Sequence, residues 1–336
     1  MARLSLLIAF SLLMACGCER SSPEDLGEGS GFIAVVGAGE NDPLWPILKG
    51  TARSHWADLS TDYYGLRVKA PPVVSVNAQA KIVRRFQEMG MRGLCIQVID
   101  PQATRQLLES LRTRGVVVVT MVTPVESNVP FDHCGWSDRD VGTRIAETLT
   151  SISPEGGYVA TLVPVDDRDK RPDRPLDIAI AQRSHEFKQR LSAYPTFKSV
   201  GEFPCSSPQS ARAQIVHSLR RFPTLRAWVS LGNGPLIDSA EAVGELESAL
   251  HGDENRIIIT DNPLCCYWPG VDSNVRMIAV AADYGLVAPT AVGVAQAVLL
   301  QGGSSRDLGR IPLRIVDNAA FQNFRTDWNH WTGTTP

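Results

Sequence analysis

Residues 32–50 read FIAVVGAGENDPLWPILKG, and this stretch decides the fold. The run at 32–36 is apolar without alternation, which is typical of a parallel strand that is covered on both faces. Two glycines then break the strand, and Asn-Asp-Pro at 41–43 supplies capping side chains and a proline suited to a first helical turn. The stretch therefore predicts a buried strand, a polar loop and the start of a helix.

The same unit recurs along the rest of the chain. Further apolar runs predict strands at 93–99, 116–122, 157–163, 198–203, 227–231, 256–260 and 275–281. Segments with the helical spacing of apolar residues separate them, and this alternation indicates an α/β protein with parallel sheets and right-handed crossovers. Because 336 residues exceed one typical domain of about 100–150 residues, two domains are expected.

The first 18 residues have the anatomy of a secretory signal, with a basic residue, an apolar stretch at 4–14 and a small residue. This stretch is too short to span a bilayer core of about 30 Å. The run from 13 to 16, Leu-Met-Ala-Cys, resembles a bacterial lipobox, which implies lipidation of Cys16; an ordinary signal peptide and a lipobox at Cys18 are the alternatives. Residues 19–31 have the composition of a solvated tether, and no later segment is expected to cross a membrane.

Composition and motifs exclude several function classes. A net charge of -3 without a basic block gives no electrostatic footprint for nucleic acid. The chain has no Gly-x-Ser-x-Gly, phosphate-loop or His-Glu-x-x-His motif, and we expect no enzymatic activity. The six histidines have no ligand spacing and the cysteines no repeated Cys-x-x-Cys pattern, so neither a metal nor another cofactor is expected.

Four motifs occur at the ends of predicted strands or in the helices that follow: Asn-x-Pro-x-Trp at 41–45, Asp-Pro at 100–101, Asp-x-x-x-Gly at 138–142 and Arg-x-x-x-Phe at 183–187. Their order resembles the periplasmic sugar-binding protein family. Members of this family are the type I, ribose- or galactose-binding-like solute receptors of ABC transporters. The resemblance covers residues 32–325, which is almost the whole chain beyond the signal segment.

The resemblance implies two Rossmann-like, doubly wound parallel-sheet lobes joined by a hinge. The N-terminal lobe is expected to contain 32–137 and 283–304, and the C-terminal lobe 138–282 and 305–330. A ligand of this family binds between the lobes.

The residues expected to bind the ligand lie near the carboxyl ends of the predicted strands. Those ends border the ligand crevice of an open α/β sheet, which makes Asn41 and Trp45 the first candidates. By the resemblance, Trp45 stacks on the ligand, and polar contacts come from Asp138, Arg183, Asn233 and Asp261. From the residues alone, Asp138 could cap a helix, Arg183 could face solvent and Asn233 could belong to a turn.

The chain departs from the family pattern at several ligand positions. Leu44 replaces a second aromatic residue, Val122-Thr123 replaces Asp-Arg or Asp-Ser, and Ala282 stands near the place of a glutamine. A buried polar group that loses its partner costs about 1–3 kcal/mol. The pattern therefore does not specify a standard pentose or hexose as the ligand.

Together, these features predict an exported, lipid-anchored solute-binding protein of the periplasm or cell envelope. It would capture a sugar or sugar-like ligand for an ABC permease and would touch the membrane through its anchor only. Two alternatives stay open: a ligand sensor that signals to a membrane receptor, and a degenerate receptor without a small-molecule ligand.

Overall fold

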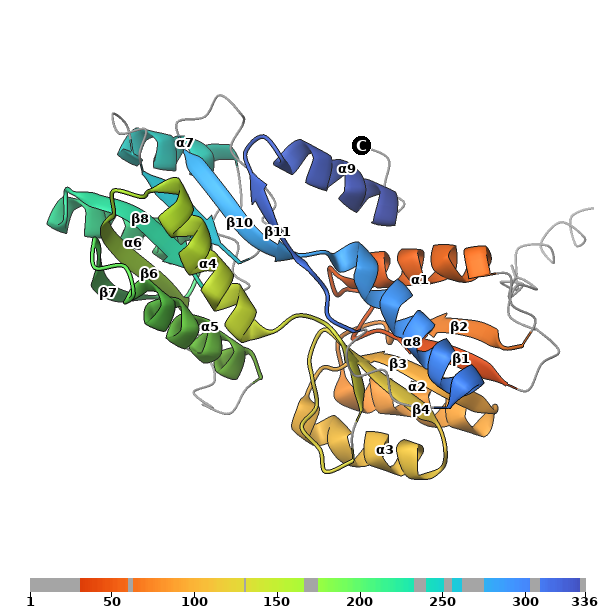
Figure 1. The fold of residues 1–336 in the computed structure, drawn as a ribbon. Coiled ribbons are helices and arrows are strands. Elements are labelled where there is room, and N and C mark those ends of the chain that lie inside the picture. Colours follow the sequence, from red (N-terminus) through yellow and green to blue (C-terminus); the bar gives the residue numbers. More distant parts are fainter. Residues whose placement is uncertain are drawn as a thin grey trace, which may run out of the picture.

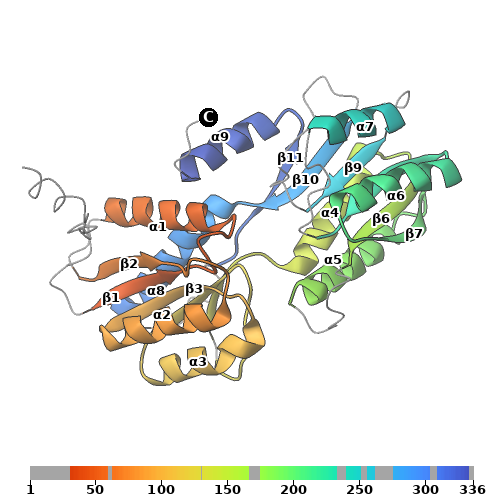
Figure 2. The same cartoon turned by 180° about the vertical axis from the view of Figure 1, so that it is seen from behind.

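The fold is described from a computed structural model of the chain. The described residues are 31–59, 63–129, 131–165, 175–232, 240–250, 256–261, 275–302 and 309–332. They form two α/β lobes that lie side by side and are joined by crossing chain segments (Figures 1 and 2). Each lobe contains one sheet with helices on both faces. The α/β class predicted from the sequence is thereby confirmed.

The first lobe contains a five-stranded parallel sheet in the order β2-β1-β3-β4-β5. Its strands are β1 (Phe32–Val36), β2 (Gly65–Lys69), β3 (Met91–Gln97), β4 (Val117–Met121) and β5 (Asp132–Cys134). Helices α1 (Trp45–Leu59) and α8 (Val287–Gln301) cover one face, and α2 (Val76–Glu88) and α3 (Pro101–Thr113) cover the other (Figure 1). Strand β1 is buried on both faces, because Ile33 packs toward α8 and Phe32 packs against Phe86 of α2.

The second lobe contains a six-stranded sheet in the order β11-β10-β9-β8-β6-β7. The strands are β6 (Gly157–Pro164), β7 (Phe197–Cys205), β8 (Leu225–Ser230), β9 (Ile257–Thr260), β10 (Arg276–Ala282) and β11 (Leu313–Asp317), and only β11 runs antiparallel to its neighbour. On one face lie α4 (Asp138–Ile152) and α5 (Pro175–Leu191), and on the other α6 (Pro208–Arg221) and α7 (Ala240–Leu250).

Three chain segments cross between the lobes and are bonded to one another. The N–H of Gly135 donates to the Gly309 carbonyl at 3.0 Å, and the Gly135 carbonyl accepts from the Ile311 N–H at 2.8 Å. The third segment joins them where the Asp283 N–H donates to the Pro312 carbonyl at 3.0 Å. A side chain at Gly309 would overlap the carbonyl oxygen of His133, so the segments can approach this closely only because Gly309 has none.

The crossings determine how the two sheets face each other. The chain leaves the first lobe just after β5 and leaves the second lobe just after β10, in both cases from the carboxyl end of a parallel strand. The carboxyl ends of both sheets therefore border the crossing segments. In open α/β sheets this edge is where ligands bind.

The last helix, α9 (Phe321–Thr332), follows a strand of the second lobe but packs on the first. Its Phe324 is buried in the core that α1 and α8 share, and its Trp331 contacts the chain at Gly50 and Gly285. The family resemblance implies that 305–330 as a whole belongs to the C-terminal lobe. The structure places β11 there and packs α9 against α1, because the aromatic face of α9 finds its apolar partners in the first lobe.

One segment beyond the N-terminus has the length and apolar composition of a membrane span, contrary to the sequence-based expectation. It runs from Tyr284 to Gln301 and comprises a short 3-10 turn, η2 (Tyr284–Leu286), and α8. Half of it is buried inside the protein, and α8 packs along β3 and β4. These contacts are those of the core helix of an α/β lobe.

Candidate ligand-binding site

Three of the residues predicted to bind a ligand meet at the carboxyl edge of the second sheet. Arg183 of α5 donates from Nε to Oδ1 of Asp138 at 2.7 Å and from Nη1 to Oδ2 of Asp261. Asp138 is the first residue of α4, and Asp261 directly follows β9. The group Asp138–Arg183–Asp261, called here the arginine triad, thus joins three separate elements of the second lobe.

Burial and charge act against each other in the arginine triad. Burial of Arg183 would lower its pKa, but the carboxylates of Asp261 and Asp138 raise that pKa above its ordinary value, so the guanidinium stays charged. Burial raises the pKa of Asp261, while Arg183 opposes that rise. The N–H of Gly232 also donates to both Asp261 oxygens, at 3.1 and 2.9 Å. The Asp261 carboxylate therefore accepts three hydrogen bonds from two donor groups, one on Arg183 and one on Gly232.

Local sequence explains why α4 and α5 bring the triad together. Gly142 lies where a side chain would overlap the carbonyl oxygen of Arg183, so the two helices touch at this glycine. Ser137 caps α4 by accepting from the Asp140 N–H, which leaves the Asp138 carboxylate to pair with Arg183. The N-cap of α4 is therefore Ser137 and not Asp138.

A second contact joins α4 and α5 beside the arginine triad. Arg139 of α4 and Glu186 of α5 approach each other to 3.8 Å. The Arg139 side chain is 71% exposed, so this ion pair contributes little to stability. The pairing was missed in the sequence, because nothing in the spacing of residues 139 and 186 indicates contact between α4 and α5.

On the first lobe, a polar network lies at the carboxyl ends of β1 and β3. The Gln79 amide donates to the carbonyls of Gly37 and Gln97, at 2.9 and 2.8 Å. The Gln97 side chain accepts from the Ala38 N–H at 3.0 Å and donates to Asp42 at 3.2 Å. Neither Gln79 nor Gln97 is among the residues predicted from the sequence, although a glutamine at the end of an apolar strand is a signal that identifies Gln97.

Asn41 lies at this edge and is exposed. Its side-chain oxygen accepts from the Val74 N–H at 3.1 Å. Among the described residues its amide nitrogen has no partner, so that group can donate to a molecule outside the chain. Asn233 and Cys16, the other predicted positions, lie outside the described residues.

Trp45 does not have the position that the sequence predicts. It is the first residue of α1, only 4% exposed, and its ring lies directly against Gly37, where no side chain would fit. The ring belongs to the core between α1 and η2, together with Tyr284. In this structure Trp45 is therefore a core residue that supports the loop, and the predicted stacking role is corrected.

The end of β4 is strained at the place where the family motif has polar residues. Val122 has a φ of 68°, a region that a β-branched residue rarely adopts. The Thr123 N–H donates to the Met121 carbonyl at 2.7 Å, which closes a tight turn around Val122. The Val122 N–H donates to the Cys134 carbonyl at 3.0 Å. The strained residue Val122 therefore lies next to Cys134, where the first crossing segment begins.

His133 lies beside this turn and is uncharged at neutral pH. Burial lowers its pKa to about 4. Its Nδ1 lies 3.0 Å from the Thr120 hydroxyl, while its Nε2 has no partner among the described residues. The described residues contain no cluster of His, Cys, Asp and Glu that could hold a metal ion. The described residues of the site offer hydrogen-bonding groups and charge.

The sequence profile described as "Periplasmic binding protein domain" matches residues 33–264. The chain belongs to the periplasmic binding protein family, whose members bind solutes and are not enzymes. Comparison with curated protein sequences gives no significant match.

Solved structures of sugar-binding proteins share the fold. The solute-binding protein of Actinobacillus succinogenes with bound D-allose is 14% identical, has a TM-score of 0.64, and aligns over 87% of this chain and 99% of its own. For the Caulobacter myo-inositol binding protein the values are 16%, 0.59, 88% and 95%. The fructose-binding periplasmic domain of a hybrid two-component system gives 14%, 0.60, 90% and 96%. The confirmed prediction is therefore the family and its two-lobe fold.

The burial of Trp45 yields a first prediction. Trp45→Ala should lower the free energy of unfolding by about 3–5 kcal/mol, because it removes a buried aromatic ring from the core. Urea denaturation measures this change. Tyr63→Ala is the control: that side chain is 66% exposed, and its loss should change stability by less than about 0.5 kcal/mol. Nearly unchanged stability of Trp45→Ala, with loss of ligand binding, would restore the stacking role.

The arginine triad yields a second prediction. Arg183→Met should destabilise the protein by about 3–5 kcal/mol, because it leaves Asp261 charged, buried and without its counter-ion. The double variant with Asp261→Asn should recover part of that loss. On the same helix, Arg190→Met removes only a half-exposed pair with Glu147 and should cost about 1 kcal/mol or less. Equal losses for Arg183→Met and Arg190→Met in urea denaturation would contradict the buried-pair argument.

Proposed function

We propose that this chain captures a small polar ligand, a sugar or sugar-like polyol, between its two lobes and passes it to an ABC-type transporter. The observation that carries the proposal is the arginine triad at the carboxyl edge of the second sheet. It combines a charged donor and carboxylate acceptors at one edge of the sheet. Proteins with this fold have been solved with D-allose and with myo-inositol bound. Sugar hydroxyls both donate and accept hydrogen bonds, so they match such a set.

The proposed mechanism follows from the placement of the polar groups. Asp138, Arg183 and Asp261 bind the ligand from the second lobe, while Asn41 contacts it from the first; Asn233 is the remaining candidate. The triad is held by mutual ion pairs before any ligand arrives, which lowers the ordering cost of binding. Hinge motion at the three crossing segments then closes the lobes over the ligand. Trp45 takes part indirectly, by supporting the loop that carries Asn41.

A ligand sensor is the second candidate function. One structure with this fold is the fructose-binding periplasmic domain of a hybrid two-component system, so the same fold also occurs in signalling proteins. In that case a membrane receptor, instead of a permease, would bind the closed form.

A degenerate receptor without a small-molecule ligand is the third candidate function. The departures from the family pattern at Leu44, Val122, Thr123 and Ala282 favour it.

A ligand screen tests the proposed function. The purified full-length chain is heated with sugars, polyols, nucleosides and amino acids, and the unfolding midpoint is compared with that of the ligand-free chain. A ligand at about 100 times its Kd adds about 2.7 kcal/mol, which should raise the midpoint by several degrees. The Asp138→Asn variant should lose this shift, and the Arg190→Met variant should keep it. A folded protein without a shift for any compound would favour the degenerate receptor.

We further propose export by the N-terminal signal and lipid anchoring at Cys16. If Cys16 carries the lipid, Cys16→Ser should move the protein from the membrane fraction to the soluble fraction of cells, because it removes the acylated thiol. Cys18→Ser is the matched control and should leave the protein in the membrane fraction. Membrane association that persists in the Cys16→Ser variant, or that is lost only in the Cys18→Ser variant, would contradict anchoring at Cys16.

A further inference from the structure

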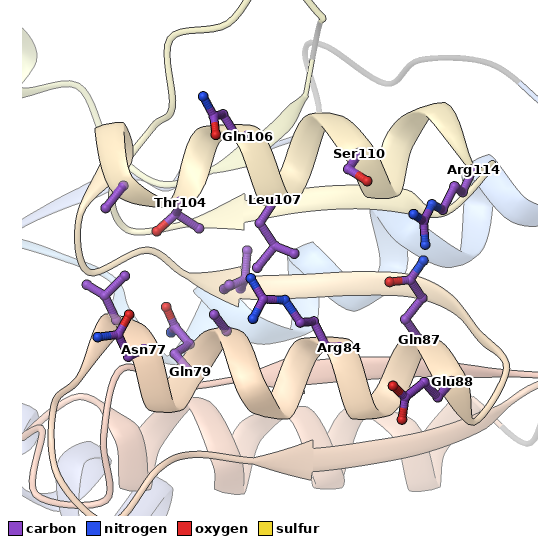
Figure 3. Close-up of a pocket in the computed structure, with 14 residues that line it drawn as sticks. Asn77, Gln79, Arg84, Gln87, Glu88, Thr104, Gln106, Leu107, Ser110 and Arg114 are labelled. Carbon is purple, nitrogen blue, oxygen red and sulfur yellow. The ribbon is translucent and has the colours of Figure 1, made fainter.

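A groove lies on the outer face of the first lobe, between α2 and α3 (Figure 3). Its volume is about 730 Å³, within the size range of small-molecule sites. Ile96 of β3 forms its floor, and Leu107 of α3 lines its middle. None of the residues of the arginine triad lines it. Gln79 of the first-lobe polar network lines it, but neither the triad nor Asn41 does, so the groove does not share the residues proposed to bind the ligand between the lobes.

A buried hydroxyl without a partner lies at one end of the groove. Thr104 is 4% exposed, and its Oγ1 has no hydrogen-bond partner among the described residues. Figure 3 shows Thr104 on the side of α3 that faces α2. Buried polar groups in native proteins are nearly always paired, so an unpaired one that faces a cavity indicates a missing partner. A ligand hydroxyl in the groove could supply it.

Two arginines line the groove from opposite walls, Arg84 near its middle and Arg114 at the end away from Thr104 (Figure 3). In Figure 3 Arg84 rises from α2 into the space between the helices, and Arg114, at the end of α3, points toward Gln87. Neither guanidinium has an ion pair within the part of the chain that the structure describes. Glu88 is the one acidic residue among those described as lining the groove, so the two arginines leave an excess of positive charge. A guanidinium binds a carboxylate or a phosphate through charge-assisted hydrogen bonds, so this charge favours an anionic ligand.

We propose that the groove between α2 and α3 is a second ligand site, for a small organic anion. The carboxylate or phosphate of the ligand binds between Arg84 and Arg114, its apolar body lies over Ile96 and Leu107, and a hydroxyl at its far end pairs with Thr104. The site goes beyond the proposed function, because it requires neither the arginine triad nor closure of the lobes.

Binding is tested on the full-length chain with a matched set of probes. The probe ω-hydroxyhexanoate carries all three features, hexanoate lacks the hydroxyl, and hexanediol lacks the anionic group. Methyl NMR signals of Ile96 and Leu107 report occupancy of the groove itself. We expect ω-hydroxyhexanoate to shift both signals, hexanoate to do so more weakly, and hexanediol to leave them unchanged. Signals that do not move with either anion, or that move equally with hexanediol, would overturn the proposal.

Variants separate the contacts of the proposed ligand. Arg84→Gln and Arg114→Gln should each weaken binding of ω-hydroxyhexanoate by roughly tenfold, because each removes a charge-assisted hydrogen bond. Arg85→Gln is the control: Arg85 is exposed on the same helix, does not line the groove, and should bind like the wild type. Equal weakening by Arg85→Gln would reduce the effect to general surface charge and overturn the site.

Thr104→Val tests the unpaired hydroxyl with little change of shape. It should reduce the affinity for ω-hydroxyhexanoate to that for hexanoate, and it should raise the unfolding midpoint of the ligand-free chain, because the unpaired group is removed. A higher midpoint with unchanged preference for ω-hydroxyhexanoate would remove Thr104 from the site. Asp138→Asn should leave anion binding intact, so failure of the proposed function and failure of this site are distinguishable.

Discussion

The arrangement of the two lobes depends on the close approach of backbones at the crossing segments. Gly135 is bonded through both its N–H and its carbonyl to the segment that contains Gly309 and Ile311. A side chain at Gly309 would overlap the His133 carbonyl, so the constraint is steric as well as hydrogen-bonded. Because two of the three crossings start at carboxyl ends of strands, this constraint also sets which residues of the two sheets can face one another. The position of the candidate site therefore depends on how the crossing segments pack at the hinge.

Near the hinge, the second lobe contains ionic interactions that are costly to bury. Arg183 is 7% exposed and is bound by two carboxylates, and the desolvation of such a group can exceed its Coulombic gain. Hydrophobic residues could fill the same space with less cost. Under the proposed function, ligand binding rather than stability accounts for a buried arginine at the edge of the sheet. The close packing of α4 and α5 at Gly142 positions it there.

Sequence patterns predicted the local elements and their class, but not every contact between them. Uninterrupted apolar runs such as residues 32–36 identify buried parallel strands, because both faces of these strands are covered. The motifs also led to Asp138, Arg183 and Asp261, which the structure brings together. Trp45 was misread, because an aromatic residue at a strand end has the same pattern whether it points to the crevice or into the core. The position of α9 was missed, because its aromatic face could pack on either lobe.

Polar groups are distributed unevenly between the two facing edges, and this bears on the ligand. In the first lobe, Gln79 and Gln97 are already satisfied by backbone groups and Asp42, and Val122 directly follows β4. In the second lobe, the arginine triad keeps charged donors and acceptors together. A hydroxyl placed against Val122 would lose its partners, whereas one placed against the triad would find them. Under the proposed function, discrimination between ligands therefore rests on the groups that face the second lobe, and an apolar or hydroxyl-poor ligand face is tolerated on the first.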